Sequence, residues 1–353
     1  MESSVVSTVE KKSLSGHRLL WIDSAKGIGI LLVALGHMMP MGWPLTKWIF
    51  SFHMPFFFLI SGICFSIKQS WRKKKFCTLL CQKGSSLGRP YLYYSLLSVL
   101  VLLMAEGPIR ALKGVYNTII LNGISALWFI PALYLGELLF IWIHRSVEKG
   151  TKRLLLYGAI VFATVLFSRI DLLAERGFIL KHLLTPANVI NRGLIGAVFV
   201  AAGFYGYELY TACRTSCPRK CRFLFAAALI LCAVVTAIVP QHNYVDLNFA
   251  ILGNPLFFYV DALAGSYVVL YLSRVLLDRR TPISFYGENS IVILGTHLNL
   301  RIKKFVQERI NPQDTKTLAA FLVLMAIETI FIFVHRRIEQ FADQALERKC
   351  DRI

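Results

Sequence analysis

The residues best suited to chemistry lie near the start of the chain, inside segments that are otherwise almost entirely apolar. Asp23, Lys26 and His37 fall in WIDSAKGIGILLVALGHMMP, and His53 falls in SFHMPFFFLISG. Placing a charged side chain at the centre of a bilayer costs about 3 kcal/mol on insertion scales, so helices that need only to be apolar do not carry one. We therefore interpret this region as a functional site.

Helical geometry places two of these side chains on one face. Lys26 and His37 are eleven residues apart, which on an α-helix is three turns plus about 20° and about 16 Å along the axis. Asp23 lies one turn before Lys26 on nearly the same side. We predict a polar stripe with a carboxylate and an amine near one end and an imidazole near the other. An imidazole takes and returns a proton near neutral pH, which suits general-base activation of an alcohol.

Two further histidines are predicted to lie at a depth similar to that of His37. His53 opens the next apolar segment, and His297 lies in ILGTHLNLR near the end of a later one. We interpret the three as a cluster; the alternative is that each bonds a neighbouring helix. No carboxylate or cysteine is spaced to complete a metal site with them. We expect neither a metal nor a permanently bound cofactor.

Other polar residues in or beside the apolar segments are candidate substrate-binding residues. Arg89 opens a segment after the most basic loop, and a guanidinium pairs well with phosphate. An ordinary interfacial anchor is the equal alternative for Arg89. The full candidate set is Asp23, Arg89, Trp128, Glu137, Asn254, Glu288, Asn289, Ser290 and His297.

The composition is that of a polytopic helical membrane protein. The chain has 353 residues, of which 56% are hydrophobic, and its mean hydropathy is +0.57. The formal charge of +19 would suggest a nucleic-acid partner in a soluble protein. Here the basic residues flank apolar runs, so orientation in a membrane is the simpler explanation. We expect no nucleic-acid binding.

Apolar runs of about 20 residues predict an all-α bundle with about ten transmembrane helices. The expected spans are 19–41, 46–67, 88–106, 126–144, 153–170, 189–211, 223–240, 250–274, 282–300 and 317–335. Residues 19–340 then form one transmembrane domain, between an N-terminal tail at 1–18 and a C-terminal tail at 341–353. Residues 107–125 are a plain loop or a re-entrant segment.

The loop charges predict the orientation of the bundle. The basic connections lie on one side if there are ten spans, and the positive-inside rule makes that side and both termini cytoplasmic. These connections are 68–87, 145–153, 212–222 and 275–281. The segment 301–316 is the exception, because it is basic on the outer side. We expect it to have a functional role or to dip back into the membrane.

Several of these segments resemble the acyltransferase 3 family of integral membrane acyltransferases, and in particular its fucose 4-O-acetylase-like group. The resemblance covers nearly the whole chain, and its strongest parts are IDSAKGIGILLVALGH, SFHMPFFFLISG, RPY, LWFIPALYLGELL, GNPLFFYVDALAG and YGENSIVILGTH. In that family a basic residue precedes an essential intramembrane histidine by eleven positions, and Lys26 and His37 match this spacing. The family's pair of arginines before the third span is reduced here to Arg89, with Ser86 at the partner position.

The resemblance implies a membrane-bound O-acyltransferase, most simply an O-acetyltransferase. Acetyl-CoA would dock at the cytoplasmic face near Arg89, Lys26 and the basic loop, and the acceptor would be a hydroxyl of an extracytoplasmic or lipid-linked carbohydrate. His37 would be the general base or a transient acyl carrier, and His53 would orient His37 or the acceptor. Succinyl is an alternative acyl group.

A polytopic transporter of a sugar or another small polar solute is the alternative from a different functional class, since buried charges suit that function too. In either case the expected location is the cell membrane, and specifically the bacterial cytoplasmic membrane. The expected partners are an acyl-CoA donor, a carbohydrate acceptor and the lipid bilayer.

Overall fold

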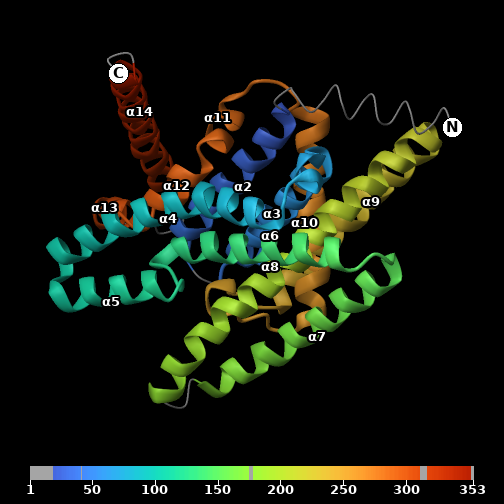
Figure 1. The fold of residues 1–353 in the computed structure, drawn as a ribbon, viewed down its shortest axis with the longest axis horizontal. Helices are drawn as coiled ribbons and strands as arrows, with labels where there is room; N and C mark the ends of the chain where they lie inside the picture. The colour runs from blue at the N-terminus through green and yellow to red at the C-terminus, as the bar shows by residue number, and fades with distance from the viewer. Residues whose placement is uncertain (1–18, 41, 175–177, 311–315, 351–353) are drawn as a thin grey trace.

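The computed structural model describes residues 19–40, 42–174, 178–310 and 316–350, and these form a helical bundle (Figure 1). Nine stretches within the described residues are long and apolar enough to cross a membrane. The helices that form them are α2 (Leu20–Met38), α3 (Pro44–Ile67), α4 (Phe76–Glu106), α6 (Phe129–Ser146), α7 (Gly150–Ala174), α8 (Phe178–Ser216), α9 (Pro218–Ile238), α10 (Pro255–Leu276) and α14 (Lys316–Cys350). Each corresponds to a predicted span, so the all-α membrane bundle is confirmed.

The remaining predicted span, 282–300, is wrong as a continuous helix. Two short helices, α11 (Pro282–Glu288) and α12 (Ser290–Thr296), occupy it and are separated at Asn289. The Asn289 side chain is held by Phe285, whose carbonyl it contacts at 2.6 Å, and by Arg336 of α14, which donates to its oxygen at 3.0 Å. Hydropathy reflects only the apolar composition of this segment. It does not predict the interruption of the helix at Asn289, which these side-chain hydrogen bonds stabilise.

The two connections with uncertain predictions are also helical. Residues 107–125 contain α5 (Pro108–Ile119), which folds back on α4 as a hairpin (Figure 1), and the 3-10 turn η2 (Ser125–Trp128) begins at the end of this range. The basic segment after residue 300 forms α13 (Ile302–Arg309). Three further 3-10 turns are η1 (Gln69–Lys73), η3 (Val239–His242) and η4 (Leu247–Phe249).

Burial separates the centre of the bundle from its periphery. α3 packs against α2, α8 and α10, and 78% of its apolar window is buried, whereas the corresponding figure for the α9 stretch is 11%. Exposed side chains on α9 such as Phe223 and Ile230 are apolar. A periphery of this kind suits contact with lipid tails, since it would be unfavourable in water.

Two glycines allow the backbones of α2 and α11 to pack directly against each other. A Cβ added to Gly27 would overlap the carbonyl of Ile283, and one added to Gly287 would overlap the carbonyl of Asp23. Small residues at helix contacts allow backbones to pack directly against each other in membranes. This contact fixes the register between the α11–α12 segment and α2, and it therefore decides which residues of α12 face Lys26 and His37.

Candidate active site

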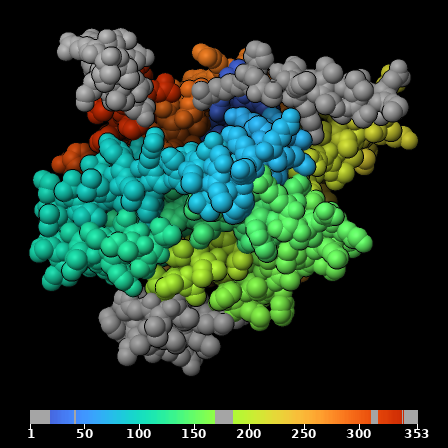
Figure 2. All heavy atoms as spheres, in the orientation of Figure 1, coloured from blue at the N-terminus to red at the C-terminus, as the bar shows by residue number. Residues whose placement is uncertain are grey.

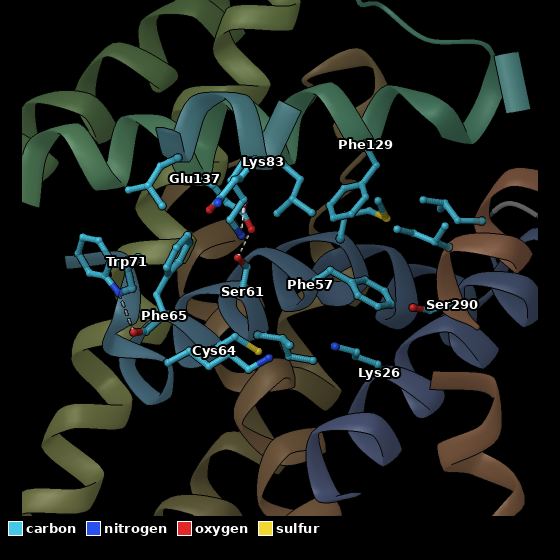
Figure 3. A pocket seen from close by; sticks show the side chains of 18 of the residues that line it. Lys26, Phe57, Ser61, Cys64, Phe65, Trp71, Lys83, Phe129, Glu137 and Ser290 are labelled. Atoms are coloured by element: carbon cyan, nitrogen blue, oxygen red, sulfur yellow. Dashed lines mark hydrogen bonds and ion pairs between the residues drawn. The ribbon is translucent and has the colours of Figure 1, made fainter. Parts of the chain in front are cut away.

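A cavity of about 420 Å³ lies between α2, α3, η1, α4, α6 and α12. It extends from exposed Lys74 and Gln82 to the partly buried Lys26. Its walls are mainly apolar and aromatic, and Figure 3 shows Phe57 and Phe129 on the two sides of its inner part. The volume falls in the range of small-ligand sites.

Four lysines line this cavity, which we call the lysine cavity: Lys26, Lys68, Lys74 and Lys83. Lys83 is held by Glu137, with 2.9 Å between Nζ and Oε2, and Glu137 also accepts a hydrogen bond of 2.5 Å from Ser61 (Figure 3). Lys74 donates to Gln82 at 2.8 Å. Within the described residues, Lys26 and Lys68 have no acidic partner, so their ammonium groups remain available for an anionic ligand.

The turn η1 forms one edge of the lysine cavity and is anchored from three sides. Trp71 lines the cavity and donates its indole N–H to the Phe65 carbonyl at 2.9 Å. Arg145 of α6 donates to the carbonyls of Trp71 and Lys74, at 2.5 and 2.6 Å.

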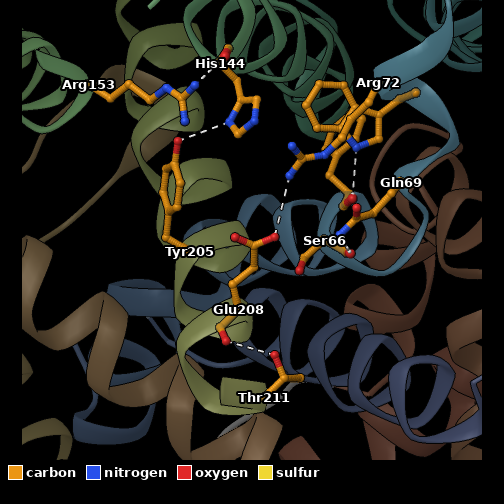
Figure 4. Close-up of polar contacts among 10 residues, drawn as sticks. Ser66, Gln69, Arg72, His144, Arg153, Tyr205, Glu208 and Thr211 are labelled. Carbon is orange, nitrogen blue, oxygen red and sulfur yellow. Dashed lines mark hydrogen bonds and ion pairs between the residues drawn. The ribbon is translucent and has the colours of Figure 1, made fainter. Parts of the chain in front are cut away.

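The third anchor involves Arg72, which pairs with Glu208 of α8 at 3.6 Å (Figure 4). In the surface view, the light-blue segment around η1 and the start of α4 lies at the front of the molecule (Figure 2). The basic turn is therefore an ordered part of the site, in addition to any role in membrane orientation.

The three predicted histidines lie close together at the far end of α2. The ring centroids of His37 and His297 are 5.5 Å apart. The Phe50 ring lies between His37 and His53 in contact with both, with centroid distances of 5.4 Å to His37 and 5.0 Å to His53. We call His37, His53 and His297 the histidine cluster.

Backbone carbonyls determine which ring nitrogen is free in two of these histidines. Nδ1 of His53 lies 2.8 Å from the Ile49 carbonyl oxygen, and Nδ1 of His297 lies 2.6 Å from that of Ile293. A carbonyl oxygen can only accept, so each Nδ1 carries the hydrogen and each neutral ring has its lone pair on Nε2. Nε2 of His297 is buried without a hydrogen-bond partner in the described structure.

Exposure distinguishes His37 from its neighbours. The side chains of His53 and His297 are 6% and 0% exposed, whereas His37 is partly accessible. His37 is thus the most accessible of the three rings.

The lysine cavity and the histidine cluster share three helices. Met54 and Leu294 line the inner part of the cavity; His53 directly precedes Met54, and His297 lies one helical turn after Leu294. On α2 the cavity is lined by Ile30, two turns before His37. Along each of these helices, a cavity-lining residue thus lies within two helical turns of a histidine of the cluster.

Three of the other predicted site residues line the cavity and two do not. Lys26, Glu137 and Ser290 line it. Asp23 is buried and does not line the cavity, and Arg89 is exposed on α4 and does not line it either.

Each of the last four predicted residues has a structural partner in the fold. Trp128 is buried beneath the guanidinium of Arg192, at 5.1 Å from its ring centroid. Asn254 caps α10 by accepting from two backbone N–H groups of its first turn. Arg336 binds both Glu288, at 3.2 Å, and Asn289, at 3.0 Å.

Sequence reasoning missed two charged residues beside the histidine cluster. Glu328 of α14 is fully buried and lies 2.5 Å from the hydroxyl of Thr296, the residue before His297. Lys303 of α13 donates its backbone N–H to the carbonyl of His297 at 3.1 Å. An acid within the last apolar run was the available signal for Glu328, whereas Lys303 lies outside the spans and depends on the fold of α13.

The family comparison gives one match. The family model described as an acyltransferase domain (Acyl_transf_3) matches residues 19–337. Because this is nearly the whole chain, the protein belongs to that acyltransferase family and is an acyltransferase of the membrane. No curated protein and no solved structure matches. Within the described residues, no group of three or more His, Cys, Asp and Glu side chains is placed to hold a metal ion.

Proposed function

We propose that this protein transfers an acetyl group from cytoplasmic acetyl-CoA to a hydroxyl of an extracytoplasmic or lipid-linked carbohydrate. One observation carries the proposal: the lysine cavity ends on the same three helices that hold the histidine cluster. A donor in the cavity and an acceptor at the histidines would then meet inside the bundle. The family match favours acyl transfer over solute transport.

The chemistry of the lysine cavity suits an acyl-CoA. Its unpaired ammonium groups on Lys26 and Lys68 complement phosphate charges, and its apolar walls complement an extended acyl-carrying arm. In this proposal Lys68 and Lys74, near the exposed side, face the phosphates. Lys26 lies deeper and faces the polar groups nearer to the thioester.

His37 acts as the general base in the proposed reaction. It removes the proton of the acceptor hydroxyl as the hydroxyl oxygen attacks the thioester carbonyl carbon. The carbon–sulfur bond then breaks, CoA leaves as the thiolate, and the proton taken by the imidazole is returned so that CoA departs as the thiol. His297 and His53, whose Nδ1 hydrogens are held by backbone carbonyls, orient His37 and the acceptor hydroxyl.

The proposal is tested by replacing His37 in cells and comparing their glycans. Cells with the His37→Ala protein should lack glycan species that are heavier by one acetyl group, while the protein level in the membrane is unchanged. His335→Ala, a histidine of α14 that packs against Tyr93 and Tyr94 of α4 and does not line the lysine cavity, is the matched control and should retain the modification. Full acetylation in the His37→Ala cells would contradict the proposal, and loss of solute uptake with acetylation intact would favour a transporter.

A further inference from the structure

α13 carries a lysine whose surroundings differ from those of its basic neighbours. Arg301 pairs with Glu106 at 3.4 Å, and Lys304 pairs with Glu308 at 3.9 Å. Lys303 has no acidic partner in the described ranges, although its side chain is only partly exposed. The middle one of three nearby cations is therefore the one that lacks a counterion.

The fold holds Lys303 against the histidine cluster. Arg301 adopts a left-handed backbone conformation with φ of 59°, and this turn allows the backbone N–H of Lys303 to bond the His297 carbonyl at 3.1 Å. Ile302 and Val306 are buried and fasten α13 to the bundle. The position of Lys303 thus follows from backbone and core contacts and does not depend on its ammonium group.

The side chain of Lys303 is close enough to the histidine cluster to interact electrostatically with it. Its ammonium acts electrostatically on the imidazoles of both His37 and His297. Burial lowers the pKa of the Lys303 amine, because removal from water disfavours the charged form. An anionic ligand beside this amine would offset that cost through a charge-assisted hydrogen bond.

We propose that Lys303 binds an anionic group of the carbohydrate acceptor, a carboxylate or a phosphate, and so orients a neighbouring hydroxyl toward His37. This inference rests on the proposed acetyl transfer and adds to it the substrate class. The donor is the less suitable source of the anion, because the lysine cavity holds its own unpaired cations at the other end of the three shared helices. Lys303 is thus a specificity-determining residue for an acidic acceptor.

Acceptors with and without negative charge provide the test. The acceptor is the carbohydrate fraction of source cells that lack the protein, used untreated, after carboxyl reduction, or after removal of phosphate. Membranes with the wild-type protein, Lys303→Ala, Lys303→Met, Lys303→Arg or Lys304→Ala receive labelled acetyl-CoA and increasing acceptor. Lys303→Met keeps an apolar stem in place, and Lys304→Ala removes the adjacent paired cation. The protein level in each membrane is measured alongside.

The expected result is a change in acceptor affinity at Lys303 alone. Lys303→Ala and Lys303→Met should raise the acceptor KM about tenfold or more, the range of a charge-assisted hydrogen bond, with little change in kcat. Lys303→Arg should restore most of the affinity, and Lys304→Ala should resemble wild type. One of the two treatments, carboxyl reduction or phosphate removal, should raise the wild-type KM for the acceptor, and that treatment identifies the anion. On the acceptor neutralised in this way, the Lys303 variants and wild type should have the same KM.

Three results would overturn the inference. It fails if wild-type protein uses both neutralised fractions as well as the untreated one, if Lys304→Ala matches Lys303→Ala, or if Lys303→Ala lowers kcat at an unchanged acceptor KM. Failure of the proposed function has a different signature, since wild-type membranes would then transfer no more label to any fraction than His37→Ala membranes do.

Discussion

The lysine cavity and the histidine cluster are built on the same helices but in opposite ways. The cavity is hollow, and two of its lysines have no acidic partner in the described structure. The cluster is packed, with two of its rings buried and their Nδ1 hydrogens bound to carbonyls. The first arrangement suits binding of a charged, flexible ligand, and the second suits holding reacting atoms in a fixed geometry.

This difference predicts that changes in the cluster act on turnover and changes in the cavity act on donor affinity. The two regions can be separated by measuring kcat and KM for each substrate in variants of each region.

His37→Ala should lower kcat about 10²- to 10⁴-fold, the usual contribution of a general base. The donor KM should change little, because His37 does not line the lysine cavity. Initial rates of label transfer at saturating donor and acceptor provide the measurement, with His335→Ala as control. A large rise in the donor KM with kcat intact would remove the functional distinction between the two regions.

Lys26→Ala should raise the KM for acetyl-CoA about tenfold with kcat nearly unchanged, since it removes an unpaired cation from the cavity. Arg89→Ala should change that KM by less than about twofold, because Arg89 is exposed and away from the cavity wall. Donor titrations at a fixed acceptor concentration compare the two directly. Equal effects of both variants would argue against a donor that extends into the inner part of the cavity.

Arg145→Ala should raise the donor KM about threefold by loosening η1, because Arg145 holds the carbonyl of Trp71 within this turn and that of Lys74 directly after it. Lys149→Ala removes an exposed basic residue from the adjacent connection and serves as the control. Limited proteolysis of solubilised protein should show faster cleavage near η1 in the Arg145 variant only. An unchanged donor KM despite that cleavage would show that the turn does not shape the donor site.

Raising the pH toward the lowered pKa of the Lys303 amine should raise the KM for the untreated acceptor by a factor of about two, because only part of the amine is then neutral. The Lys303 amine is charged below its pKa, and burial holds that pKa below its ordinary 10.5. The acceptor KM therefore rises as pH rises through the lowered pKa, and the neutral amine no longer attracts an anion. In Lys303→Arg the rise in KM should be absent, because a guanidinium stays charged over this pH range. The arginine variant thus distinguishes titration of the Lys303 amine from titration of His37 and His297, whose imidazoles interact electrostatically with Lys303. A rise of equal size in the arginine variant would assign the pH effect to another group.

Much of the site was predictable because it depends on local geometry. The spacing of Lys26 and His37 on one face requires only a continuous helix, and α2 supplies one over Leu20–Met38. The meeting of His37 with His297 was predicted from similar membrane depth, and the rings do lie 5.5 Å apart. Their catalytic roles stay predictions.

Other assignments failed to form a common site because polarity does not reveal the partner. Glu288 and Asn289 are as polar as any ligand-binding residue, yet Arg336, distant in sequence, binds both of them. Arg89 begins an apolar run, but the rotation of α4 leaves it exposed. In each case the packing of other helices decides whether the side chain is paired or exposed. The spacing of residues within one segment does not predict that packing.

The class of fold, nearly all the membrane helices and the polar stripe of α2 could be inferred without the structure, because apolar length and helical period are local properties of the chain. The packed bundle was needed to show that α11 and α12 are separate, that η1 forms the edge of a cavity, and that Lys303 lies beside His297. These features depend on contacts such as Gly27 against Ile283 and Arg145 against Trp71. Such contacts join residues far apart in the chain, and they form only when the helices pack.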